Sequence, residues 1–228
     1  MEPLHVTAVM GGAAALSRPT LLDGPLLAAV VEERAEQAGV DPYDLPWLDP
    51  REALPLDVER GGHHWYSRCS DARYEVAARD AAHWSKRFDL DEAEEVLERD
   101  RSVNLKSGRY RIHRQPLYLV VTARIEWWCL GDRVRLEELL PRVRYLGKKR
   151  AYGHGPVLRW EVEPSGDDWS LRGPEGELMR PLPLAHKRVG RAVDRGELVV
   201  TREETLQPNP PYWTQHHPAL CAVDGRWT

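Results

Sequence analysis

One stretch of the chain combines glycines, cations, a tyrosine and a histidine, and these residue types suit phosphate binding. From Arg144 to Arg159 the sequence has five Lys or Arg residues and no carboxylate. Glycine tolerates positive φ and lets a ligand approach the backbone, so N–H groups can contact phosphate oxygens while nearby cations supply charge. Tyrosine and histidine rings can stack on unpaired bases. The predicted RNA-binding loop consists of Gly147, Lys148, Lys149, Arg150, Tyr152, Gly153, His154 and Gly155.

Two common phosphate motifs do not fit this loop. A P-loop needs Lys-Ser or Lys-Thr after its second glycine, whereas Gly153 is followed by His154. The dinucleotide fingerprint needs G-x-G-x-x-G after a strand, and here the spacing differs and the loop follows a predicted helix. A glycine-rich turn with a solvated, charged tip remains the alternative, because charge runs usually face water.

Further candidates for contact with nucleic acid are scattered along the chain. Five of them are predicted to line a free sheet face or an inserted hairpin, with surface cations that bind no ligand as the alternative: Arg68, Lys86, Arg87, Arg109 and Arg111. For Trp84 the alternative is a buried core tryptophan, and for Arg180 it is a buried cation. These candidates are Arg68, Trp84, Lys86, Arg87, Arg109, Arg111, His113 and Arg180.

Catalytic chemistry has weaker support in the sequence. Histidine could act as general acid or base in RNA cleavage, and His113, beside Arg111, is the first candidate, with His154 second. No G-x-S-x-G elbow occurs, and no acidic cluster has two-metal spacing. We therefore predict no catalytic residue, no metal and no cofactor.

Composition limits the class of protein. The chain has 228 residues, a formal net charge of −4 and a charged content of 30%. The acidic balance argues mildly against a nucleic-acid binder, but a local basic face is what contacts phosphate. Three distant cysteines without a C-x-x-C pair indicate reduced thiols and no common zinc site. No apolar run is long enough for a membrane span, so a cytoplasmic location is expected.

The predicted elements alternate between strands and helices. Residues 4–10 read as a strand, and Asp23-Gly24-Pro25 as the start of a helix with Asp23 as N-cap and Gly39 after its end. Residues 117–129 form the strongest predicted strand. Asp132 should cap a second helix over 132–143, and 157–162 should return as a strand. This order predicts an α+β, ferredoxin-like (RRM-like) core with both helices on one sheet face.

The remaining segments read as additions to this core. We place the ferredoxin-like domain at residues 1–165, with an irregular, proline-rich insert at about 41–107. Within the insert, residues 89–98 favour an acidic helix. Residues 166–228 are predicted to form a β-rich C-terminal extension that packs on the core.

A ferredoxin-like core with a glycine-rich loop after its second helix resembles the RAMP superfamily of CRISPR proteins. The chain is most similar to the RAMP subunit of type IV CRISPR effector complexes, which resembles the 5′-handle-binding subunit of other classes. The resemblance covers most of residues 4–183, and the order of the pieces carries it. These pieces are residues 21–27, 108–111, 125–132, 139–149, 152–155 and 180–183.

The resemblance implies a non-catalytic subunit of a CRISPR ribonucleoprotein effector complex in antiviral defence. Such a subunit grips the 5′ handle of the CRISPR RNA (crRNA) and contacts the large subunit and the backbone RAMP subunit. The resemblance leaves open whether it also contacts target DNA near the PAM. A CRISPR-RNA processing endoribonuclease that uses histidine as general acid or base is the alternative.

Overall fold

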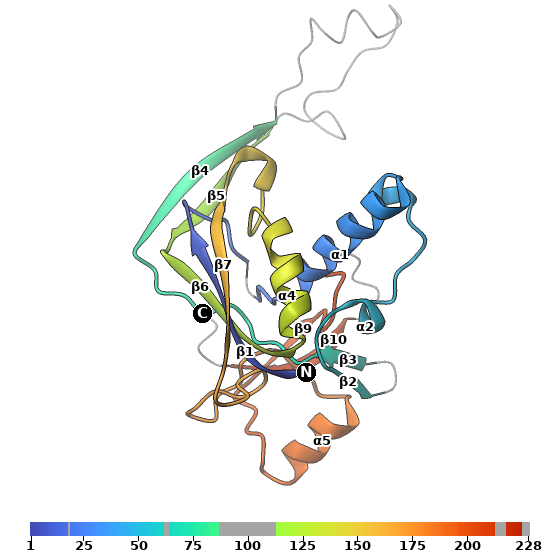
Figure 1. Cartoon of the computed structure of the whole chain (residues 1–228). Helices are drawn as coiled ribbons and strands as arrows, with labels where there is room; N and C mark the ends of the chain where they lie inside the picture. Colours follow the sequence, from blue (N-terminus) through green and yellow to red (C-terminus); the bar gives the residue numbers. More distant parts are fainter. Residues whose placement is uncertain (18, 62–63, 87–112, 213–217, 225–228) are drawn as a thin grey trace, which may run out of the picture.

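The computed structural model describes residues 1–17, 19–61, 64–86, 113–212 and 218–224 (Figure 1). Its centre is an antiparallel sheet with the strand order β6-β1-β7. β1 spans Glu2–Met10, β6 spans Arg124–Gly131 and β7 spans Val157–Pro164. The helices α1 (Asp23–Ala38) and α4 (Arg133–Leu139) lie on the same side of this sheet.

Alternating side chains explain why this sheet has one buried face. Leu4, Val6 and Ala8 of β1 are fully buried, as are Ile125 and Trp127 of β6. They pack in one cluster with the apolar faces of α1 and α4, because a period of two directs every second strand residue to the same face. The indole N–H of Trp127 donates to Thr20 O at 2.9 Å, which satisfies its buried donor.

The predicted helix ends are confirmed at two of three positions. Gly39 ends α1 with φ of 66°, and Asp132 caps α4 by accepting from the Arg135 N–H at 3.2 Å. The prediction for Asp23 is wrong, because Leu22 is the N-cap and Asp23 is the first helical residue. The Asp23 carboxylate is instead buried against Arg180 at 3.6 Å.

The single strand predicted over 117–129 is also wrong. The chain turns at Thr122-Ala123 and forms two strands, β5 (His113–Val121) and β6. β5 pairs with β4 (Ala78–Lys86) in a separate two-stranded sheet. The Thr122 hydroxyl donates to Arg124 O at 2.8 Å and holds a turn that has neither glycine nor proline to reveal it.

The segment at residues 68–73 lies beside the other edge of β6. Cys69 and Arg73 form isolated antiparallel bridges with Cys129 and Glu126, and the Leu130 N–H donates to Arg68 O at 2.9 Å. This segment takes the position of a fourth strand of the sheet but pairs with β6 only through isolated bridges. With β1 central and two helices on one face, the arrangement is α+β and compatible with the predicted ferredoxin-like core.

The other described elements lie mainly below this core in Figure 1. A hairpin of β2 (Val58–Gly61) and β3 (His64–Ser67) follows η1 (Pro42–Asp44) and α2 (Pro50–Ala53). The C-terminal residues form the sheet β8-β10-β9 from Leu182–Pro183, Ala219–Val223 and Arg202–Leu206. Tyr66 of β3 packs with Leu182 and with Val189 of α5 (Lys187–Asp194) in a second apolar cluster. Among the described helices, none has the length and apolar character needed to span a bilayer.

Candidate nucleic-acid interface

The glycine-rich loop is a projection closed at its neck by backbone hydrogen bonds. The Leu146 N–H donates to Gly155 O at 2.8 Å, and the Gly155 N–H donates to Ala13 O at 2.8 Å. The Lys148 N–H donates to Ala15 O, also at 2.8 Å. Residues 13–15 thus form hydrogen bonds with both ends of the loop, and these bonds fix the base of the loop in place.

Several positions in this loop need a left-handed backbone. Gly147, Gly153 and Gly155 have φ of 90°, 81° and 73°. Lys149 has φ of 58°, the one positive value among the described residues other than glycine. L-residues adopt this region at a cost and often at functional sites. The turn η4 (Arg150–Tyr152) lies between Lys149 and Gly153, so the conformation turns the cationic tip outward.

The loop presents positive charge to solvent. Lys148 and Arg150 are exposed, and no carboxylate of the described residues lies within 4.0 Å of either. The Lys149 ammonium lies 5.9 Å from the centroid of the Tyr152 ring, within the range of a cation–π contact. Tyr152 is 64% exposed. The loop therefore offers cations and one exposed ring, which a nucleic-acid backbone and an unpaired base would match.

The β4–β5 hairpin lies next to the loop. Ala14 pairs with Val120 of β5 through two hydrogen bonds of 2.9 Å, so residues 13–15 join the hairpin to the loop. Lys149, Tyr152 and His154 face His83 and Ser85 across a cleft of about 120 Å³. The glycine-rich loop and the β4–β5 hairpin therefore form adjacent parts of one surface.

The predicted residues of the hairpin are only partly described. Trp84 and Lys86 lie on β4, where Lys86 pairs with His113 at the start of β5. The side chains of these three residues are outside the described part of the structure. Arg87, Arg109, Arg111 and the acidic segment at 89–98 lie outside the described residues altogether. The structure thus places the backbone of Trp84, Lys86 and His113 on the β4–β5 hairpin.

The free face of the central sheet is not the predicted cationic surface. It carries Glu126, Glu161 and Glu163 as well as Arg124 and Arg159. Both arginines contact Glu161, at 3.5 Å and 2.8 Å respectively. Further along, His5 stacks on Trp128 with centroids 4.7 Å apart. Paired charges and this ring contact leave no surplus of cations on this face.

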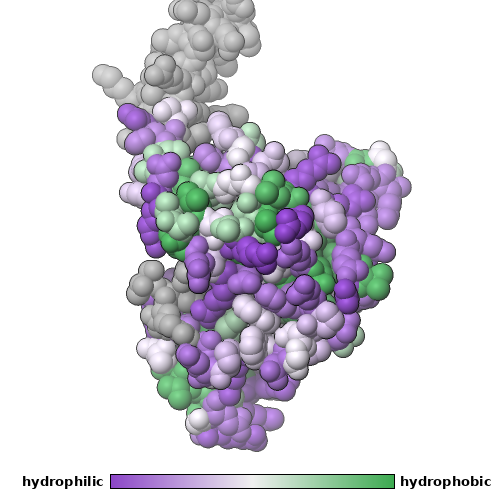
Figure 2. All heavy atoms as spheres, turned by 60° about the vertical axis from the view of Figure 1, so that its left-hand side comes forward, coloured by the Kyte–Doolittle hydropathy of each residue, from purple (hydrophilic) through white to green (hydrophobic). Residues whose placement is uncertain are grey.

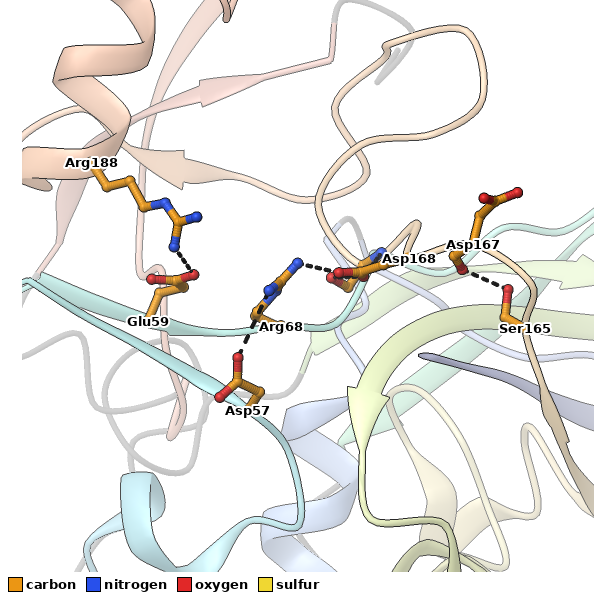
Figure 3. A network of polar contacts seen from close by, with 8 residues as sticks. Asp57, Glu59, Arg68, Ser165, Asp167, Asp168 and Arg188 are labelled. Atoms are coloured by element: carbon orange, nitrogen blue, oxygen red, sulfur yellow. Dashed lines mark hydrogen bonds and ion pairs between the residues drawn. The ribbon is translucent and has the colours of Figure 1, made fainter. Parts of the chain in front are cut away.

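Arg68 lies away from the loop. Its guanidinium is 3.9 Å from Asp57 and forms a hydrogen bond with Asp168 (Figure 3). Arg68 belongs to a groove beside the β2–β3 hairpin. The structure therefore separates it from the predicted loop site.

Arg180 faces the interior, so its place among the residues that contact RNA is not supported. Its side chain is 0% exposed and donates to Pro208 O at 2.7 Å and Cys69 O at 3.3 Å. Burial, with the charge of Asp23 as the next cause, raises the pKa of the Cys69 thiol and the Tyr212 hydroxyl well above their usual values. Both groups stay neutral around the Asp23–Arg180 pair, which acts as a structural link.

The support of the loop by residues 13–15 is not among the features predicted from the sequence. Residues 13–15 are three alanines after Gly11-Gly12, and small side chains allow the close backbone approach seen here. This run of small residues is the sequence signal that could have predicted the close approach of residues 13–15 to the loop. No group of three or more potential metal ligands occurs in the part of the chain that the structure describes.

Comparison with known families agrees with this architecture. The family described as CRISPR type IV associated protein Csf3 matches residues 2–223. No curated protein matches the chain. The family match spans the core, the loop and the C-terminal extension, and the α+β arrangement is consistent with a RAMP-like subunit. The chain therefore belongs to the family of the CRISPR type IV associated protein Csf3.

Proposed function

We propose that this chain is the non-catalytic subunit that grips the 5′ handle of the guide RNA in a type IV effector complex. The family indicates a subunit of such a complex. The handle as ligand, and the large and backbone subunits as neighbours, are our proposal. The cytoplasm is its proposed location, and contact with target DNA near the PAM is left open.

The observation that carries the proposal is the braced, cationic loop. Lys148 and Arg150 are exposed without an ion pair to a described carboxylate. Hydrogen bonds to Ala13 and Ala15 fix the backbone on which they stand. Binding by a fixed loop loses less conformational entropy than binding by a loose one. The formal net charge of −4 does not oppose this reading, because local charge governs contact with phosphate.

The triple variant Lys148→Ala/Lys149→Ala/Arg150→Ala tests the proposal. If all three cations contact phosphates, the slope of log affinity against log salt should fall by about 2, and affinity should fall about 100-fold at about 0.1 M salt. The measurement is binding of repeat-derived RNA to the full chain across a salt series. Tyr152→Ala should separately cost roughly 1–3 kcal/mol if a base stacks on the ring.

A variant with the same loss of charge elsewhere serves as control. Arg34, Arg133 and Arg202 lie on α1, α4 and β9, and replacing these three by alanine should leave the salt slope nearly unchanged. Thermal melts establish that both variants fold. An unchanged slope and affinity for the loop variant would show that the loop is a solvated turn.

One observation favours the endoribonuclease as second candidate. His83, Lys149, Tyr152 and His154 surround one cleft, and histidines with Tyr or Lys suit metal-independent RNA cleavage. Against it, the cleft of about 120 Å³ is smaller than the roughly 300–1,000 Å³ of ligand pockets. Incubation with end-labelled repeat RNA decides: a product abolished by His154→Ala would favour the nuclease.

Exposed apolar side chains support the proposed contacts with other subunits. Figure 2 shows hydrophobic side chains in the upper half of one face of the molecule and mostly hydrophilic ones below them. Exposed apolar residues of β5 and β7 include Tyr118 and Leu158, at 75% and 67%. Where such side chains gather into a patch, the surface usually marks an interface.

Substituting these side chains should therefore affect assembly more than folding. Tyr118→Ser/Leu158→Ser is expected to reduce the recovery of this chain with co-expressed complex subunits about tenfold or more, since burying one such side chain contributes about 1.5–3 kcal/mol. Pull-down yield and melting temperature are the two measurements. Undiminished recovery would place the interface elsewhere.

A further inference from the structure

A second cationic surface lies in a groove beside α5. We call it the α5 groove: it has a volume of about 760 Å³ and is bounded by α5, the β2–β3 hairpin and residues 168–172. In Figure 1 α5 lies at the bottom of the molecule, and the glycine-rich loop lies near the top, beside β5. The groove is therefore separate from the proposed handle site.

Cations outnumber carboxylates in the groove. Its described lining has three carboxylates, Glu59, Asp168 and Glu197. Each pairs with an arginine: Glu59 with Arg188, Asp168 with Arg68 and Glu197 with Arg195. Figure 3 shows the first two of these pairs side by side along the hairpin. The lining cations are Arg60, Arg68, Arg172, Lys187, Arg188, Arg191 and Arg195.

Four of these cations have no such partner. Arg60, Arg172, Lys187 and Arg191 are exposed, and no carboxylate of the described chain lies within 4.0 Å of any of them. A concave surface with an excess of one sign of charge attracts ligands of the opposite sign. The groove therefore suits a polyanion.

The helix itself concentrates this charge. Lys187, Arg191 and Arg195 follow one another at intervals of four residues, which places them on one face of α5 and its end. Like charges at this spacing destabilise a helix. Val189 of the same helix is buried in the apolar cluster and anchors α5, and Lys187, Arg191 and Arg195 line the groove. A bound anion would relieve the repulsion.

The lining favours a phosphodiester backbone over a protein segment. The rings of the described lining belong to Tyr66 and His186, and each is only 2% exposed, so neither can stack on a base. Of the apolar lining residues, Leu182, Val189 and Leu198 are buried. Leu171 and Ala192 are half-buried, and none is among the exposed residues. Protein interfaces have an exposed apolar centre before they form, whereas this groove exposes cations. Contact would be independent of base sequence.

We propose that the α5 groove binds the phosphodiester backbone of a nucleic-acid strand as a second site, separate from the glycine-rich loop. Lys187, Arg172 and Arg191 contact phosphates, and the Arg188–Glu59 pair holds the helix against the hairpin. This inference does not depend on the loop binding the handle. It gives the complex a second point at which RNA or DNA is held along its backbone.

The test uses the full chain carrying Arg172→Gln/Lys187→Gln/Arg191→Gln, with Arg34→Gln/Arg133→Gln/Arg202→Gln as the charge-matched control outside the groove. Both sets of substitutions are also made in the Lys148/Lys149/Arg150→Ala background. In that background any remaining binding does not come from the loop, so a failure of the groove proposal is told apart from a failure of the loop proposal. The probes are oligouridine, oligothymidine and duplex DNA, each of about 20 nucleotides or pairs. Poly-glutamate serves as the protein-like polyanion.

Three lost phosphate contacts should reduce affinity for a single strand about 100-fold at about 0.1 M salt, and one lost contact about 5-fold. Loss with oligouridine identifies RNA as the source of the phosphates, and loss with either DNA probe identifies DNA. Affinity within twofold of the control variant for all three nucleic acids would overturn the proposal. So would an equal or greater loss with poly-glutamate, which would indicate an acidic protein partner.

Discussion

Replacing Arg180 with methionine is expected to lower the free energy of unfolding by about 3–5 kcal/mol, the usual cost of breaking a buried ion pair from one side. Arg180 and Asp23 are both 0% exposed, with Nη1 and Oδ2 3.6 Å apart. Removing the guanidinium leaves a buried carboxylate without its cation. It also leaves the Pro208 and Cys69 carbonyls without this donor.

This pair joins parts of the chain that are distant in sequence. Asp23 begins α1, and its carboxylate accepts from the Tyr212 hydroxyl at 2.5 Å. Pro208 follows β9, so Arg180 ties the start of the first helix to the C-terminal extension. We therefore expect Arg180→Met to loosen the extension from the core, detectable as faster hydrogen exchange in β10.

Urea unfolding of the full chain measures the predicted loss. Arg142→Met is the control, because Arg142 contacts Glu36 at 2.8 Å on the surface and exposed pairs contribute little. The double variant Asp23→Asn/Arg180→Met should regain part of the loss, since it removes both buried charges. A wild-type midpoint for Arg180→Met would contradict the structural role of the pair.

Gly155→Ala is expected to destabilise the chain by roughly 2–5 kcal/mol, from left-handed backbone strain and overpacking together. Gly155 has φ of 73°, and an added Cβ would overlap the carbonyl oxygen of Leu146. That carbonyl belongs to the neck of the loop, where Leu146 and Gly155 share a hydrogen bond of 2.8 Å. The substitution should open the neck and release the loop from Ala13.

Gly153→Ala is the matched control two residues away. Gly153 has φ of 81°, but no heavy atom outside its chain neighbours lies within 4 Å of an added Cβ. Only the backbone strain of roughly 1–2 kcal/mol should appear. Denaturation midpoints and proteolysis of the loop compare the two variants. Equal effects would mean that the neck relaxes freely, and that the loop is not fixed as described.

Local chemistry in the sequence determined the elements that position the loop. Alternation in β1, the glycine after α1 and the aspartate cap of α4 each depend on residues within one turn or strand. The loop was likewise evident from three glycines and a run of cations. Such signals survive without tertiary contacts, because they act through φ, capping hydrogen bonds and side-chain period.

Only the tertiary structure decided where each cation lies. Arg68, Arg150 and Arg180 look alike in sequence, yet one is paired in a groove, one is exposed on the loop and one is buried. The partners of Arg180 include Ser67, 113 residues away, and those of Arg68 include Asp168, 100 residues away. The turn at Thr122 and the bracing of the loop by Ala13 and Ala15 also depend on distant segments. A guanidinium carries the same charge in all these settings, so the chain that folds around it determines whether it stabilises the core or remains available to a ligand.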